Sequence, residues 1–286
     1  MLHTPSSHQW QLRHQLWEIP ATGGIMGILN VTPDSFSDGG RHASLHTAIE
    51  HARTMLNQGA HIIDIGGEST RPGAIPVSPA EEERRTAPVI AALRREFPHA
   101  LLSIDTRHPS VAAAALAAGA DIINDITGLT SAEMRALCAT HPCGIVLMHM
   151  QGTPQTMQIA PSYTDVVAEV RTFFENQLTL AKSAGISSTR ICLDPGIGFG
   201  KTTAHNLTLI RNLESLRIAN RPLLMALSRK RFLGEILHNP DLPKSTPLPT
   251  AVMSLLAAQN GANLHRVHDV APLHHTLSLL RSLQNS

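Results

Sequence analysis

The sequence has few cysteines and few aromatic residues, and it lacks a long basic run. Its three cysteines, Cys138, Cys143 and Cys192, form no CxxC pair and leave an odd count, which argues against a disulfide framework or a structural zinc site. Lys and Arg total 23 against 22 acidic residues, so the charge is nearly balanced. We therefore expect neither nucleic acid nor a membrane as partner, and any anionic ligand must be recognised locally.

The sequence also lacks a long hydrophobic run. The longest alanine-rich apolar segment, residues 111–120, is ten residues long and contains Gly119, whereas a helix needs about 20 apolar residues to span a bilayer. The N-terminal residues include His3, His8 and Arg13 and do not resemble a signal sequence. Together with the cysteine content, these features predict a cytoplasmic protein.

What the chain does contain is a series of eight short apolar runs that each end on a polar or charged cluster. Segments rich in Ala, Leu, Glu and Arg separate most of them, and this alternation of strands and helices is typical of a parallel sheet covered by helices. Eight units predict a closed (β/α)8 TIM barrel, with the active site at the C-terminal ends of its strands. The predicted strands are residues 25–30, 61–67, 101–106, 121–126, 144–150, 190–198, 223–228 and 262–269.

A single domain accounts for the length, because 286 residues with 42% hydrophobic content fit one α/β barrel. We assign residues 23–286 to the barrel. Residues 1–22 precede the first strand and are expected to form a short extension or to pair with a sheet edge.

Two loops rich in Gly, Pro, hydroxyl and charged residues follow the first two predicted strands. The first holds Phe36, an unusual residue in a chain with 3% aromatics, and the second runs over residues 66–74. A simple surface turn explains the first loop by itself, but two such loops on one rim suggest a lid that excludes water.

Carboxylates and an amide end several strands. Strand alternation places Ser103 and Asp105 on one face, and Ile122 and Asn124 on one face of the next strand. A buried carboxylate is costly without a partner, which makes Asp105 and Asp194 candidate ligand-binding groups. The alternative is a solvated carboxylate or a helix cap.

The glycines after Asp194 resemble a phosphate-binding P-loop only superficially. The segment from Gly196 to Lys201 lacks the required spacing, and position 195 is Pro. We expect these glycines to let the backbone approach a flat ligand, with Phe199 at its edge or face.

Basic residues gather near the C-terminus. On a strand, Arg266 and His268 share a face and form a candidate cationic clamp for phosphate, while His265 points the other way, which argues against metal binding by the two histidines. Lys230 directly follows the seventh predicted strand, where barrels often place phosphate-binding or substrate-binding groups.

Taken together, these segments resemble the dihydropteroate synthase family over residues 24–280. The matching motifs occur in family order and at family-like separations: GILNVTPDSFSDGG, GGESTRPGA, SIDTR, IINDITG, VLMHMQG, LDPGIGFGK, SRK and RVHD. The resemblance implies a Mg²⁺-dependent condensation of 4-aminobenzoate with (7,8-dihydropterin-6-yl)methyl diphosphate, which yields dihydropteroate and diphosphate.

The resemblance also implies a role for each matching residue. The pterin diphosphate contacts are Thr70, Asp105, Asn124, Met148, Asp194, Lys230, Arg266 and His268. The 4-aminobenzoate contacts are Phe36, Arg71, Pro72, Phe199, Lys230 and Arg231. Asn30 is the implied Mg²⁺ contact, and Arg266, His268 and Lys230 are the expected catalytic groups.

The expected mechanism is ionisation, in which diphosphate leaves and the arylamine attacks a pterin-stabilised cation without a general base.

Two residues depart from the family pattern. Ala226 replaces a usual Gly near the pterin floor, and Arg231 replaces a usual Ser near the aminobenzoate carboxylate. Sulfonamides imitate 4-aminobenzoate with a different acidic group, so Arg231 is expected either to alter their binding or to point into solvent.

Two other functions are compatible with parts of the pattern. Methyltetrahydrofolate-dependent methyltransferases share a related pterin-binding barrel but lack the two loops in this form and the SRK lysine. A non-catalytic pterin-binding protein is expected to lose the phosphate-binding residues, which are present here.

The family is typically homodimeric, and the apolar segment at residues 250–258 is a candidate for either barrel core or subunit contact.

Overall fold

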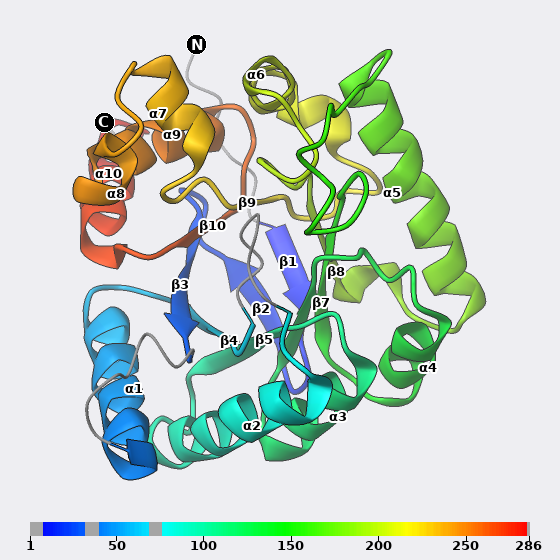
Figure 1. Cartoon of the computed structure of the whole chain (residues 1–286), viewed down its shortest axis with the longest axis vertical. Coiled ribbons are helices and arrows are strands. Elements are labelled where there is room, and N and C mark those ends of the chain that lie inside the picture. The colour runs from blue at the N-terminus through cyan, green and yellow to red at the C-terminus, as the bar shows by residue number, and fades with distance from the viewer. Residues whose placement is uncertain (1–7, 32–39, 69–75, 285–286) are drawn as a thin grey trace.

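Eight parallel strands form the centre of the molecule, as the sequence predicts (Figure 1). The computed structural model describes residues 8–31, 40–68 and 76–284. The strands lie in the order β8-β7-β6-β5-β4-β3-β10-β9. A parallel bridge between Leu193 and Leu223 joins the two ends of this order and closes the barrel.

Each predicted run overlaps one barrel strand: β3 begins one residue before its run, and the other seven strands are shorter than their runs. The barrel strands are β3 (Gly24–Asn30), β4 (Ile62–Gly66), β5 (Leu101–Asp105), β6 (Ile122–Asp125), β7 (Gly144–Met148), β8 (Ile191–Asp194), β9 (Leu224–Met225) and β10 (Leu264–Val267).

Helices surround the barrel in Figure 1 and pack their apolar faces against the outer face of the strands. They are α1 (Gly40–Asn57), α2 (Pro79–Glu96), α3 (Pro109–Ala118), α4 (Ala132–Thr140), α5 (Val166–Ser183), α6 (Thr203–Arg211), α7 (Arg231–Ile236), α8 (Leu242–Ser245), α9 (Leu248–Gln259) and α10 (Val270–Gln284). Two short 3₁₀ helices, η2 (Ser188–Arg190) and η3 (Leu213–Leu216), follow α5 and α6.

The inward face of the strands changes from apolar to polar along the barrel axis. An interior apolar cluster includes Ile62, Ile122, Cys192 and Leu264. Because side chains on a strand alternate between its two faces, the next inward residues lie two positions further on. These residues are Asp64, Asn124, Asp194 and Arg266, so the polar groups form a layer directly above an apolar floor.

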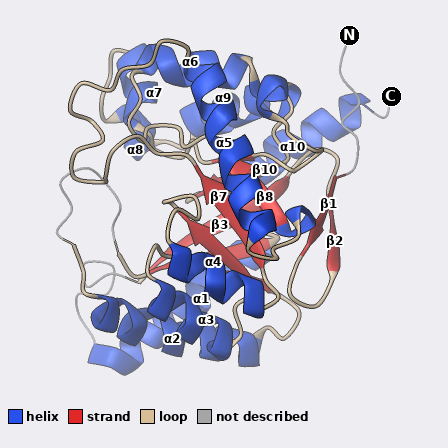
Figure 2. Ribbon diagram, turned by 90° about the vertical axis from the view of Figure 1, so that its right-hand side faces the viewer, coloured by secondary structure: helices blue, strands red, loops and turns tan. Residues whose placement is uncertain are grey.

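The N-terminal residues form a hairpin of their own, so of the two expected alternatives the structure has the short extension and not the pairing with a sheet edge. Strands β1 (His8–Gln11) and β2 (Leu16–Ile19) pair with each other in a separate antiparallel sheet at one end of the barrel (Figure 2). Trp10 is fully buried in the interior apolar cluster, and its indole donates a hydrogen bond to the Arg190 carbonyl at 2.7 Å. The hairpin therefore plugs the N-terminal end of the barrel.

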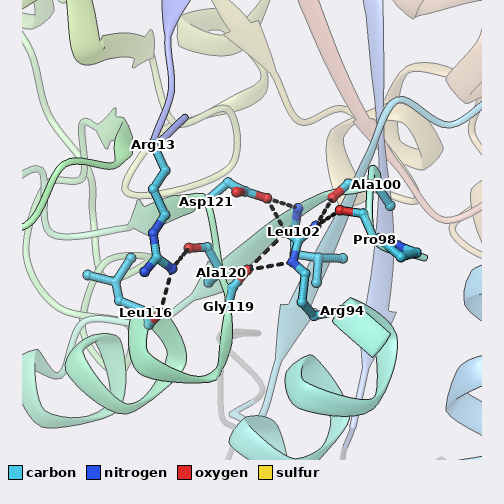
Figure 3. A network of polar contacts seen from close by, with 9 residues as sticks. All are labelled: Arg13, Arg94, Pro98, Ala100, Leu102, Leu116, Gly119, Ala120 and Asp121. Atoms are coloured by element: carbon cyan, nitrogen blue, oxygen red, sulfur yellow. Dashed lines mark hydrogen bonds and ion pairs between the residues drawn. The ribbon is translucent and has the colours of Figure 1, made fainter. Parts of the chain in front are cut away.

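A guanidinium network ties the neighbouring elements together near this end of the barrel (Figure 3). Arg94 donates to the carbonyls of Pro98, Ala100 and Gly119 and forms an ion pair with Asp121 at 2.5 Å. Asp121 also accepts the Leu102 amide at 2.9 Å. Arg94 therefore satisfies carbonyl groups in the segment between α2 and β5 and at the C-cap of α3, where a helix leaves acceptors unpaired.

Candidate active site

The C-terminal end of the barrel holds a ring of polar side chains, which we call the polar ring. Its members come from five strands, although the sequence separates them by as many as 202 residues. Several lie on the inward face at the level where the apolar floor ends. The polar ring consists of Asp64, Ser103, Asp105, Asn124, Asp194 and Arg266.

Arg266 joins two carboxylates of the polar ring. Its Nε lies 2.6 Å from Asp64 Oδ2, and its Nη2 lies 2.6 Å from Asp105 Oδ2. Burial opposes the charge of the guanidinium, but Asp64 and Asp105 raise the pKa of Arg266 above its ordinary value. Asn124 also donates its amide to Asp64 Oδ2, at 3.1 Å. Two carboxylates therefore already pair with this arginine, and its role in a cationic clamp for phosphate stays a prediction.

The second oxygen of each carboxylate has no hydrogen-bond partner among the described residues. Both Asp64 Oδ1 and Asp105 Oδ1 are buried, and so is the unpartnered hydroxyl of Ser103. Burial, followed by the charges of Asp64 and Glu68, raises the pKa of Asp105 despite the opposing effect of Arg266. A buried acceptor without a donor is costly. The polar ring is therefore prepared to accept N–H groups from a ligand.

Asp194 lies on the opposite side of the polar ring, and the glycine-rich segment orients its carboxylate. The Gly196 amide donates to Asp194 Oδ1 at 2.7 Å. Burial raises the pKa of Asp194 to about 6, while this hydrogen bond and nearby Lys230 oppose the rise. Gly196 has φ +67°, and a Cβ there would lie only 1.9 Å from the His149 carbonyl oxygen. Only glycine fits this turn.

Lys201 fastens the glycine-rich segment to β7 instead of facing a phosphate, in agreement with the predicted absence of a P-loop. Its buried Nζ lies 2.9 Å from His149 Nδ1 and donates to the carbonyls of Gly196 and Phe199 at 3.1 and 3.0 Å. Burial lowers the pKa of Lys201 to about 7. This residue supports the site from behind, a role that the sequence analysis missed.

Apolar side chains form a wall beside the polar ring, made of Ile126, Met148, Met157 and Phe199. The Lys230 ammonium lies 4.2 Å from the centroid of the Phe199 ring, in a cation–π arrangement. Gly198 allows this approach, since a Cβ there would lie 3.3 Å from Lys230 Cδ. A flat ligand edge bound by Asp194 and Asn124 would have this wall against one face.

His268 belongs to the same end of the barrel but faces a different partner from Arg266. Its Nδ1 lies 2.9 Å from Ser228 Oγ, and its backbone N–H donates to the same hydroxyl at 3.2 Å. The neighbouring Arg229 instead pairs with Asp269 at 3.0 Å. Ser228 thereby fixes the orientation of His268 at the rim.

Asn30 ends β3 next to this polar cluster. Asn30 pairs with Gly66 in the strand register, and Gly66 pairs with Asp105. A Cβ at Gly66 would lie 3.8 Å from both Asn30 Oδ1 and Asp105 Oδ2, so the missing side chain keeps these two oxygens facing the same space. Amide and carboxylate oxygens are the donors that Mg²⁺ prefers. The residues present therefore fit a Mg²⁺ contact at Asn30.

The structure thus brings together nine of the predicted site residues: Asn30, Asp105, Asn124, Met148, Asp194, Phe199, Lys230, Arg266 and His268. Phe36, Thr70, Arg71 and Pro72 lie outside the described residues. Arg231 does not face the site, because its side chain is 79% exposed and forms an ion pair with Glu235 at 2.9 Å.

Two members of the polar ring had no assigned role in the sequence analysis, Asp64 and Ser103. Asp64 stood out only as an acidic residue inside the apolar run Ile62, Ile63, Ile65, and it is fully buried. The missed signal is the alternation that places it two residues after the inward-facing Ile62.

The comparisons with known proteins agree with this geometry. A family model described as "Pterin binding enzyme" matches residues 26–268, which is most of the chain. The chain belongs to the pterin-binding enzyme family. Within this family it is 52% identical over 247 residues to the dihydropteroate synthase of Synechocystis sp., a match that covers 86% of this chain and 85% of that protein.

Solved structures of pterin-binding enzymes have the same fold. One is Xanthomonas albilineans dihydropteroate synthase with 4-aminobenzoic acid, which has a TM-score of 0.90, 42% identity and coverage of 98% of this chain and 100% of that one. Another is the same enzyme in complex with 7,8-dihydropteroate, with a TM-score of 0.82 and coverage of 92% and 94%. None of the helices described in this pterin-binding enzyme is both long and apolar enough to cross a membrane.

Proposed function

We propose that this protein is a dihydropteroate synthase, which joins 4-aminobenzoate to (7,8-dihydropterin-6-yl)methyl diphosphate and releases diphosphate. The observation that carries this assignment is the polar ring, in which buried carboxylate oxygens of Asp64 and Asp105 have no described partner. The structures of relatives with 4-aminobenzoic acid and with 7,8-dihydropteroate support the same substrates. The relatives' names favour this reaction over a pterin-dependent methyl transfer.

The pterin ring binds by its polar edge. A 2-amino-4-oxo pterin presents adjacent N–H donors, which a carboxylate such as Asp194 accepts in a bidentate arrangement. Asn124 both donates and accepts along the same edge, and Met148 packs against the ring face. The Gly196 hydrogen bond to Asp194 holds the carboxylate in place before the ligand arrives.

Charge stabilisation drives the reaction. Two carboxylates face one guanidinium in the contacts among Asp64, Asp105 and Arg266, so this group carries excess negative charge when Asp105 is ionised. Such a group stabilises the positive charge that develops on the pterin methylene as diphosphate leaves. Lys230 and His268 lie near the rim and bind the departing anion. The arylamine is largely unprotonated at neutral pH and attacks without a general base, and the arylammonium that forms then loses its proton to water.

Mg²⁺ is the proposed cofactor, and Asn30 is the residue that holds it. Asn30 would supply a side-chain oxygen ligand, and a bound Mg²⁺ would supply neutralisation of charge on the leaving diphosphate. Arylamine positioning falls to Phe199 and Lys230, together with Phe36, Arg71 and Pro72, which lie outside the described residues.

The function is tested by product identification. Purified protein with both substrates and Mg²⁺ should give 7,8-dihydropteroate, identified by mass, and a sulfonamide should compete with 4-aminobenzoate. If the protein bound the pterin but formed no product, it would be a pterin-binding protein without synthase activity.

Arg231 provides a prediction about inhibitor binding. Because its side chain is 79% exposed and paired with Glu235, we expect Arg231→Ser to change the sulfonamide inhibition constant by less than about threefold, as for an exposed pair. A larger change would show that Arg231 reaches the aminobenzoate pocket when substrates bind. Inhibition constants should be compared at one concentration of 4-aminobenzoate. The control is Lys244→Ser, because Lys244 is also exposed and pairs with Asp241 on its own helix turn.

We propose a homodimer whose contact includes α9 and α10. The segment at residues 250–258 has features that suit both predicted purposes, because Ala251 and Ala257 are buried whereas Val252 and Leu256 are about half exposed. Leu279 on α10 is 70% exposed, and these two helices pack against each other. Exposed apolar patches of this kind mark protein interfaces. We expect twice the chain mass in light scattering and a monomer for the double variant Leu256→Glu, Leu279→Glu.

We also propose a cytoplasmic location. All three cysteines are free and buried, a state that suits a reducing compartment.

A further inference from the structure

Three potential metal ligands lie together behind the polar ring. Glu68 follows β4, Glu82 lies in the first turn of α2, and His108 is the N-cap residue of α3. One ligand atom from each lies within 4.8 Å of the others. The topology brings them together, because β4 and β5 are neighbours in the sheet and α2 connects them.

Glu82 is completely buried, beside the Thr106 hydroxyl. Neither carboxylate oxygen meets a donor of normal geometry within the described part of the chain. Gly67 packs directly on this side chain, since a Cβ there would lie 3.0 Å from Glu82 Cγ. A buried carboxylate without a donor is costly and rare. Its environment therefore requires a bound proton or a cation.

His108 and Glu68 also have lone pairs available beside the Glu82 carboxylate. His108 Nε2 is buried and has no partner among the described residues. The His108 backbone N–H donates to Thr106 Oγ1 at 3.1 Å, which fixes the turn that carries the ring. Glu68 Oε2 accepts Arg107 Nε at 3.3 Å, and a carboxylate oxygen has a second lone pair.

The local charges favour a cation. Glu68 and Glu82 face one guanidinium, that of Arg107, which is bound to Glu68 through Nε and Nη2. Arg107 therefore compensates the first carboxylate and leaves the charge of the second without a counterion in the described residues. The remaining negative charge lies beside an unpartnered imidazole nitrogen, and this combination of donors is typical of a metal site.

We propose that Glu68, Glu82 and His108 bind a divalent transition-metal ion, such as Zn²⁺ or Mn²⁺. One imidazole with two carboxylates favours these ions over Mg²⁺ and Ca²⁺, which prefer all-oxygen sites. The three ligands are not members of the polar ring, and the role of the ion is structural. The ion links the segment after β4 to α2 and to the N-terminus of α3, and it thereby holds the base of the loop that follows β4.

The test is metal binding by the full chain after treatment with EDTA. Co²⁺ is titrated while its visible absorption is followed, and Zn²⁺ affinity is measured by competition with a chromophoric chelator. We expect one equivalent to bind, and we expect Glu82→Gln and His108→Ala each to weaken binding by at least about tenfold. The matched controls are the exposed Glu83→Gln and His99→Ala, which should bind like the parent chain.

Controls are necessary because the chain contains 17 histidines, which bind metals weakly at the surface. Zn²⁺ should also raise the melting temperature of the parent protein but not that of Glu82→Gln. If His108→Ala fails to fold, His108→Gln replaces it. Absence of a one-equivalent site, unchanged binding by Glu82→Gln, or equal competition by Mg²⁺ would overturn the proposal.

Discussion

Arg266→Ala is expected to lower kcat by at least about 100-fold, which is the effect of removing one preorganised charged group from an active site. Arg266 is the shared partner of Asp64 and Asp105 at 2.6 Å. Without it, the two carboxylates repel each other and no longer hold the geometry that stabilises the developing cation. Steady-state kinetics with saturating 4-aminobenzoate measure kcat, and titration calorimetry measures pterin binding.

The same substitution should weaken pterin binding by less than about tenfold, because the ring edge is bound mainly by Asp194 and Asn124. Equal losses in turnover and binding would contradict the role assigned to Arg266. Removing one partner from a buried ion pair also costs about 3–5 kcal/mol of stability, so folding must be checked. Asp64→Asn in the Arg266→Ala background should recover part of that stability without recovering turnover. Arg53→Ala, which breaks an exposed pair with Glu96, is the control.

Asp194→Asn is expected to weaken pterin binding by about 10- to 100-fold, since a hydrogen bond to a charged group contributes about 1.5–3 kcal/mol. Asparagine has the same shape and still accepts the Gly196 amide, so the loop should keep its structure. Its NH₂ group, however, faces the donors of the pterin edge. Calorimetric titration with the pterin diphosphate checks the prediction, with the exposed Asp241→Asn as the control. Unchanged affinity would place the pterin edge elsewhere.

Asp194 should also determine how substrate capture depends on pH. Burial raises the pKa of Asp194 to about 6, although Lys230, Lys201 and Arg266 oppose the rise. The carboxylate must be ionised to accept two N–H groups, and protonation below this pKa removes that capacity. The value of kcat/KM for the pterin substrate should therefore fall by about tenfold per pH unit below pH 6. Asp194→Asn should lose this dependence.

The sequence predicts the barrel because the barrel is built from local patterns. Each strand is a short apolar run, and each ends at a polar cluster such as Asn30 or Asp105. The apolar runs therefore locate the strands, and the polar residues that end them locate the active-site face. The N-terminal hairpin could not be predicted in the same way. Trp10 and Trp17 signal a packed strand, but nothing nearby in the sequence indicates that Trp10 enters the end of the barrel.

Site residues were predicted by resemblance, but their partners were not. Arg266 was predicted to bind phosphate, yet the residues that neutralise it lie 202 and 161 positions away. Pairing over such separations depends on barrel closure, which no local pattern encodes. Lys201 was missed for a related reason, because its partner His149 lies on the neighbouring strand end, 52 positions away.

Diphosphate release by the purified protein tests the central claim most directly, namely that this polar ring promotes loss of diphosphate and transfer of the pterin to an arylamine. The measurement uses pterin diphosphate and Mg²⁺, with and without 4-aminobenzoate, and repeats both with EDTA. We predict rapid release that depends on 4-aminobenzoate and Mg²⁺, with dihydropteroate formed in equal amount. Pterin binding with no release under any condition would contradict the account and would assign the protein as a pterin-binding relative without synthase activity.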